Sequence, residues 1–227
     1  MCRFRPMATV SVRPTAEVRG LRENCSIAVA RDHGTSPEAT QSKERKSVSL
    51  RTHIVLMASY NQWMNAKLYE AAGRLPLGEL AADRNAFFGS LLGTLNHIVV
   101  ADTIWLKRFA THPAAHAALD PVRKLTLPGS LDQILFAEFA ELSNHRKFLD
   151  KVICVWTESL TDADLAHVLQ YANTKGVVGH RRFSSLVFHF FNHQTHHRGQ
   201  ATTLLHQAGQ DVGVTDLLAL IPNESDA

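Results

Sequence analysis

The sequence predicts an all-α protein built on a four-helix bundle. Four long segments carry apolar residues at helical spacing, and no β-strands alternate with them. A link of about 20 residues between the second and third of these segments is long enough for a crossover. With 45% hydrophobic and 20% charged residues, the 227-residue chain has the composition of an ordinary globular protein.

Each expected helix has a start or stop signal. Gly73 and Pro76 close the first helix, and Pro113 follows the second. Ser130 opens the third with Gln133 as its capping-box partner, and Ser184 or Ser185 caps the fourth, which stops at Gly209. The expected helices cover residues 49–73, 77–82 (a short turn), 85–111, 130–156, 184–208 and 215–220.

A small hairpin is expected before the fourth helix. Two runs, 167–171 and 177–183, flank the turn sequence Asn173–Gly176. Residues 1–48 show no sustained hydrophobic period, so we expect a disordered or misassigned N-terminal extension there. The sequence thus divides into this extension, a helical domain over 49–222 and a short tail, 223–227.

Charge and cysteine content restrict the class of protein. Residues 1–48 hold nine of the 24 Lys and Arg but five of the 21 acids, so the helical part is close to neutral and gives no reason to expect nucleic acid as a partner. No apolar run approaches the roughly 18 to 20 residues that span a bilayer. Three cysteines without a CxxC motif favour a reducing compartment, and we expect a cytoplasmic protein that does not enter a membrane.

Histidine is the most informative residue type. Five of the 13 histidines fall in the last long helix. At about 100° per residue, His193 and His197 share the face that carries apolar residues such as Leu186, Phe190 and Leu204. An i, i+4 pair can bind one metal ion, and His97 in the second helix is the candidate third ligand.

The simpler interpretation is that these are ordinary polar or buried histidines, and spacing alone leaves both open. His189 and His196 lie nearer the edge of the face and are candidates for the mouth of the site. The remaining histidines are scattered or in loops, and we expect solvated side chains at His33, His53, His112, His116, His145, His167, His180 and His206.

Four short segments stand out in the sequence: Leu95–Ile98, Asn192–Gln200 (which contains HxxxHRGQ), Tyr60–Trp63 and Thr215–Leu218. Together they resemble the DinB/YfiT-like family of metalloproteins. The resemblance spans about 50–222. It implies an up-down-down-up bundle, a three-histidine site for zinc, nickel or a similar ion, frequent homodimers, and ligands at His97, His193 and His197.

Other metal architectures are disfavoured. A di-iron bundle needs Glu-x-x-His pairs, and a zincin needs H-E-x-x-H; the sequence has neither. Among the neighbours of the candidate ligands, we expect Gln200 and Asn96 to be available for hydrogen bonds to imidazoles, and Asp102 and Arg198 to be available as a pair that orients the site or serves only as a structural ion pair.

Three imidazole ligands carry no charge, so a divalent ion bound by them keeps its full positive charge. They also leave at least one coordination position open, which is typical of catalytic sites. The wider family includes enzymes that use low-molecular-weight thiols. We therefore expect a small-molecule substrate, such a thiol among the candidates, and activation of a thiol or water for transfer or hydrolysis. The alternative is a non-enzymatic, stress-associated protein whose bundle uses the ion only for stability.

Overall fold

The computed structural model describes residues 49–223, so the extension expected over 1–48 and the last four residues lie outside the described part. The described chain is mostly helical with one small two-stranded sheet. Its elements are α1 (Leu50–Ala72), α2 (Leu77–Ala81), α3 (Leu91–Phe109), η2 (Ala117–Leu119), α4 (Asp120–Arg123), α5 (Phe139–Glu158), α6 (Asp162–Ala166), β1 (Val168–Ala172), β2 (Val178–Arg182), α7 (Phe183–Gln207) and η3 (Leu217–Leu220).

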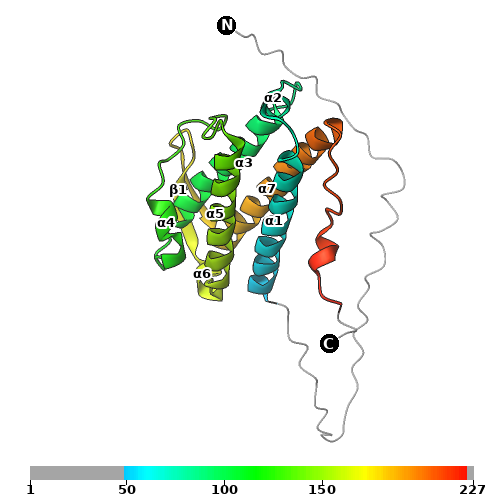
Figure 1. Ribbon diagram of the computed structural model, residues 1–227. Helices are drawn as coiled ribbons and strands as arrows, with labels where there is room; N and C mark the ends of the chain where they lie inside the picture. The colour runs from blue at the N-terminus through cyan, green and yellow to red at the C-terminus, as the bar shows by residue number, and fades with distance from the viewer. Residues whose placement is uncertain (1–48, 224–227) are drawn as a thin grey trace, which may run out of the picture. The chain divides into compact units, whose positions relative to one another are not determined.

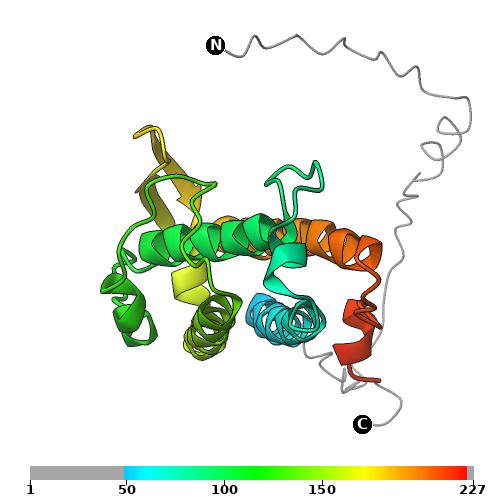
Figure 2. The same ribbon diagram turned by 45° about the horizontal axis from the view of Figure 1, so that its top comes forward.

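The four long helices enclose the hydrophobic core. Helix α1 packs against α5 and α7, and α3 packs against the same two helices from the other side. Figure 2 looks nearly along α1 and α5, whereas α3 and α7 run across that view, so the two pairs are inclined to each other. Large buried side chains such as Trp156, Phe109 and Phe190 fill the space between them. No helix within 49–223 combines the length and apolar character needed to cross a bilayer.

Local capping explains where the first helices begin. The Ser49 hydroxyl accepts a hydrogen bond from the Thr52 amide at 3.2 Å, and Ser90 does the same for Gly93 at 3.0 Å. The start expected near residue 85 for the second helix is therefore wrong: α3 begins at Leu91, after a turn closed by the bridge between Ala86 and Gly89.

The start expected for the third helix at Ser130 is also wrong. Helix α5 begins at Phe139, and residues 130–138 are an irregular link. Gln133 does not complete a capping box; its side-chain oxygen accepts a hydrogen bond from the Gly129 amide at 2.8 Å. Leu131 and Ile134, which mimic a helical stripe, are exposed. The link matters for the site because its backbone reaches α3.

The hairpin lies where the sequence predicts it, between α6 and α7 (Figure 1). Val168 pairs with Arg182 and Ala172 with Val178 in an antiparallel register. The Asn173 side chain accepts hydrogen bonds from two amides in the turn. Helix α7 begins directly after β2 at Phe183 without a side-chain cap, so the caps expected at Ser184 or Ser185 are absent.

Candidate metal centre

Three histidines from two neighbouring helices meet inside the helical core. His97 lies on α3, and His193 and His197 lie one turn apart on α7. The Nε2 atom of His197 is 3.2 Å from His97 Nε2 and 3.1 Å from His193 Nε2. A tetrahedral ion bound at 2.0 to 2.1 Å spaces its ligand atoms about 3.3 Å apart. The observed spacing therefore fits a single ion between the three rings.

The outer nitrogens of two rings fix which tautomer faces the centre. His97 Nδ1 lies 2.7 Å from the Leu131 carbonyl oxygen, and His197 Nδ1 lies 2.8 Å from Gln200 Oε1. Both partners only accept, so each Nδ1 donates its proton and each Nε2 carries a lone pair. Two lone pairs 3.2 Å apart repel each other unless a cation or a proton lies between them. The local chemistry thus favours a positive charge at this point.

Burial keeps the three rings neutral. Desolvation lowers the pKa of His97 and of His197 below the usual histidine value, although the hydrogen bonds to Leu131 and Gln200 act in the opposite direction. For His193, desolvation and then the neighbouring rings of His197 and His97 lower the pKa to about 3. Neutral imidazole is the form that binds a metal ion.

The loop before α3 covers one side of the cluster. The Phe88 ring stacks on His97 with centroids 3.8 Å apart and planes inclined by 16°, and its edge faces His197. Gly93 allows this approach, because a Cβ atom there would lie 2.2 Å from the Phe88 carbonyl oxygen. The small residue Gly93 therefore leaves space for the loop.

A buried charge network lies beside the cluster. Arg146 on α5 contacts Asp102 on α3 and, at 3.0 Å, Asp150 on its own helix. The pairing expected between Asp102 and Arg198 is not observed; Arg198 donates to Asn61 instead. Burial raises the pKa of Asp102 despite Arg146, whereas the pKa of Arg146 rises because the two carboxylates outweigh its own desolvation. Arg146 was not a candidate from the sequence, because nothing in the local pattern marks a buried arginine.

Of the expected hydrogen-bonding neighbours, Gln200 bonds a ring of the cluster, through His197 Nδ1. Asn96 hydrogen-bonds the backbone N–H and carbonyl of Phe136, which ties the link to α3 and leaves no bond to an imidazole. His189 and His196 are exposed on α7. The His196 ring lies 4.8 Å from that of His197, whereas the His189 ring lies against Trp105, 5.0 Å away.

Two histidines expected to be solvated are buried. His112 and His116 follow α3 and lie next to Asp164 of α6, forming a second group of potential ligands within 49–223. Both belong to an H-x3-H spacing identical to that of His193 and His197. That repeated spacing was the signal that the sequence offered.

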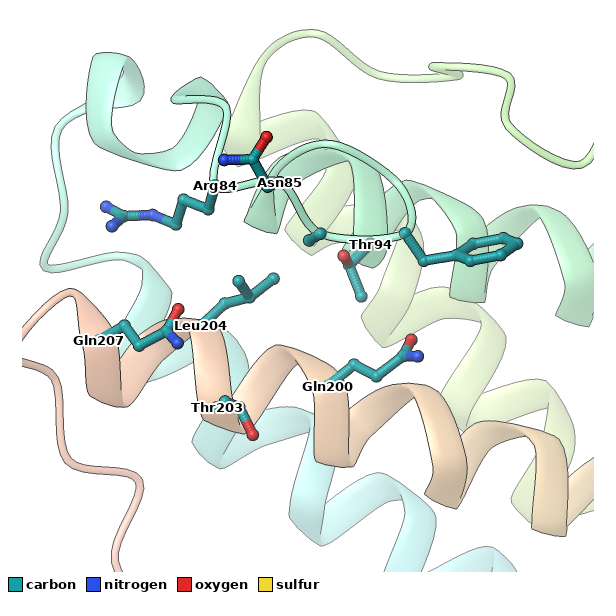
Figure 3. A pocket seen from close by; sticks show the side chains of 9 residues that line it. Arg84, Asn85, Thr94, Gln200, Thr203, Leu204 and Gln207 are labelled. Atoms are coloured by element: carbon teal, nitrogen blue, oxygen red, sulfur yellow. The ribbon is translucent and has the colours of Figure 1, made fainter. Parts of the chain in front are cut away.

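A cavity lined largely by polar residues lies near the three-histidine cluster. It has a volume of about 320 Å³ and lies between the 84–87 loop and the C-terminal half of α7. Figure 3 shows Gln200, Thr203 and Gln207 on α7, across from the loop that carries Arg84 and Asn85. Gln200 connects the two features, because it lines the cavity and holds His197.

A wider cavity of about 840 Å³ lies between the link and the hairpin. One of its lining residues is Leu131, whose carbonyl oxygen bonds His97 Nδ1.

A helical core in which three histidines converge is compatible with a metal-dependent function. The model of the DinB family matches residues 46–225, and the chain belongs to that family. Protein DinB of Bacillus subtilis (strain 168) is 26% identical over 161 residues, which covers 69% of this chain and 87% of the relative. No solved structure gives a significant match.

Proposed function

We propose that this protein is a metal-dependent enzyme acting on a small molecule, with one divalent transition metal ion, zinc or nickel, held by His97, His193 and His197. The observation that carries the proposal is the convergence of Nε2 atoms whose protons are held away on Nδ1. Such an ion supplies Lewis acidity that activates a water or a thiol at neutral pH for hydrolysis or transfer. Family membership is consistent with a metal-dependent role.

The chain's own residues position the reaction. Gln200 and the Leu131 carbonyl hold two rings in place, and Phe88 excludes water from one side of His97. We propose that the substrate binds in the 320 Å³ cavity, whose volume lies at the small end of ligand pockets. Arg84, paired with Glu79 at 2.7 Å, has a buried Nε–H with no acceptor among residues 49–223. An anionic group on a small thiol substrate would supply that acceptor.

A non-enzymatic role is the second candidate, in which the ion only stabilises the bundle. It is favoured by the composition of the cluster: within the described residues, no carboxylate joins the three histidines to act as a general acid or base. The two functions differ in what loss of the ion changes. An enzyme loses turnover, whereas a structural site loses only stability.

The test compares metal-loaded wild type with His97→Ala. Elemental analysis identifies the ion first, and turnover is then assayed with electrophiles plus glutathione or other thiols and with hydrolysable esters. Loss of turnover in His97→Ala, with activity kept in the control His180→Ala on the exposed face of β2, supports the enzyme. Absence of turnover with every thiol and ester, together with a large metal-dependent rise in Tm, supports the structural role instead.

The finer architecture belongs to the same proposal. We propose that α1, α3, α5 and α7 form the up-down-down-up bundle of the family and that the protein works as a cytoplasmic homodimer. Light scattering on the purified protein tests the dimer, since a monomeric mass contradicts it.

A further inference from the structure

We propose that His112, His116 and Asp164 form a second site for a divalent transition metal ion, separate from the three-histidine centre. Their potential ligand atoms lie within 4.8 Å of one another. His112 follows the C-terminus of α3, and the 12 helical steps from His97 to Phe109 span about 18 Å. The two sites are therefore separated by the C-terminal two-thirds of α3.

A tight turn brings the two histidines together. The Ala115 amide donates to the His112 carbonyl oxygen at 2.9 Å, and Ala115 has a φ of 48°, which L-residues rarely adopt. Arg123 holds both sides of this turn, donating to the carbonyl oxygens of Ala110 at 2.9 Å and His116 at 3.3 Å. The imidazole rings of His112 and His116 end with centroids 5.2 Å apart.

Both rings carry a buried nitrogen without a partner. His112 is 5% exposed and His116 is 8% exposed. The Nε2 atoms of both are buried and have no partner at normal hydrogen-bond geometry within the described chain, although the Asp164 backbone lies close enough to the His112 ring to offset part of the lowering of its pKa by burial. A buried polar atom left unsatisfied costs about 1 to 3 kcal/mol. One ion bound by both nitrogens would remove this desolvation cost for each of the two rings.

Asp164 supplies the third ligand and is already fixed. Its Oδ2 accepts from the Thr161 amide at 2.9 Å and from the Thr161 hydroxyl at 2.8 Å, as the capping box of α6. These bonds leave Oδ1 for an ion. Two imidazoles and one carboxylate suit zinc, iron(II) and neighbouring first-row ions, with further positions open to solvent or ligand.

The hydrogen bond at the other nitrogen of His112 predicts weaker binding than at the first centre. The Ala114 amide donates to His112 Nδ1 at 3.1 Å, so in the metal-free form the ring proton lies on Nε2. Binding an ion through Nε2 moves that proton to Nδ1 and breaks the bond from Ala114. The three ligand atoms must also close from up to 4.8 Å to about 3.3 Å.

Metal stoichiometry of the full-length protein tests the second site. Chelator-stripped protein is titrated with Co²⁺ and with Zn²⁺. We expect two equivalents for wild type, one for His97→Ala, and none for His97→Ala combined with His116→Gln. The matched control is His97→Ala combined with His180→Gln, which removes an exposed histidine and keeps one equivalent. In wild type, the Ala114 amide resonance should shift only with the second equivalent.

The outcomes separate the two sites. If His97→Ala keeps its helical circular dichroism but binds no ion, or if His116→Gln leaves the stoichiometry unchanged, the second site does not exist. If His116→Gln fails to fold, Asp164→Asn replaces it, because the amide oxygen preserves the cap while weakening the ligand. If instead His97→Ala binds as many ions as wild type, the proposal for the three-histidine centre is wrong. The second site is then still supported if His116→Gln lowers the number of ions bound.

Discussion

Replacing Gln200 with leucine tests whether the outer hydrogen bond sets the three-histidine centre. Leucine keeps the approximate bulk but removes the Oε1 atom that lies 2.8 Å from His197 Nδ1. Without that acceptor, His197 exchanges between tautomers and part of its population presents an N–H to the ion. Losing such a partner lowers metal affinity about 10- to 100-fold, which corresponds to about 1.4 to 2.7 kcal/mol.

The assay is competition for Zn²⁺ against a chromophoric chelator of known affinity. Gln207→Leu is the matched control, because Gln207 lines the same cavity on the same helix without contacting a ligand ring. Imidazole nitrogen NMR of the metal-free protein gives an independent readout, since the Nδ1–H tautomer of His197 should lose population in Gln200→Leu alone. Equal Kd values for wild type and Gln200→Leu, or an equal loss in Gln207→Leu, would refute the reasoning.

Three further predictions concern stability. Arg146→Met leaves the Asp102 carboxylate buried without its partner, and urea unfolding should show a loss of about 3 to 5 kcal/mol; a loss below about 1 kcal/mol contradicts the network. Gly93→Ala forces the Phe88 loop away and should cost about 1 to 3 kcal/mol while weakening Zn²⁺ binding, and unchanged Tm and Kd would contradict it. Acidification from pH 7 to 5 should destabilise the metal-free protein. In the unfolded chain His193 binds a proton over this range, whereas in the folded protein its pKa of about 3 keeps it neutral, so low pH favours the unfolded state. Allowing for partial exposure, this amounts to about 1 kcal/mol, and urea unfolding that is equally stable at both pH values contradicts it.

Local rules were sufficient for the features that depend on one helix. The spacing of His193 and His197 and the apolar residues around them fix which way both rings point, so their convergence was predictable from helical geometry. His97 was predictable as the one histidine on the facing stripe. Helix α1 also begins and ends close to its expected limits, because Ser49 caps it and Gly73 follows it.

The helix starts that failed depend on contacts distant in sequence. Leu131 fits the helical spacing of apolar residues. Its carbonyl oxygen nevertheless accepts a hydrogen bond from His97 Nδ1, 34 positions away in the sequence. The segment 130–138 is also held to α3 by Asn96. The side-chain amide of Asn96 hydrogen-bonds the N–H and carbonyl of Phe136, in place of the backbone hydrogen bonds of a regular helix. Apolar spacing cannot report such long-range bonds, and here it predicted a helix across the segment that holds the His97 ring in place.

Charge pairing was not predictable for a related reason. Asp102 has two candidate arginines, and the sequence places Arg198 beside a ligand, which made that pair attractive. Because α3 packs on α5, Asp102 instead forms an ion pair with Arg146, and Arg198 donates a hydrogen bond to Asn61 on α1. Partner choice among buried charges follows from which helices touch, and helical period alone does not determine it.

The two H-x3-H pairs show that spacing is a weaker guide than the hydrogen bonds on the outer nitrogens. In the pair on α7, His197 Nδ1 faces an oxygen that accepts, so Nε2 is free to bind a cation without rearrangement. In the pair after α3, His112 Nδ1 faces an N–H that donates, so Nε2 holds the proton until an ion displaces it. Identical spacing therefore predicts different affinities, and as metal is added the three-histidine centre should fill before the site at His112.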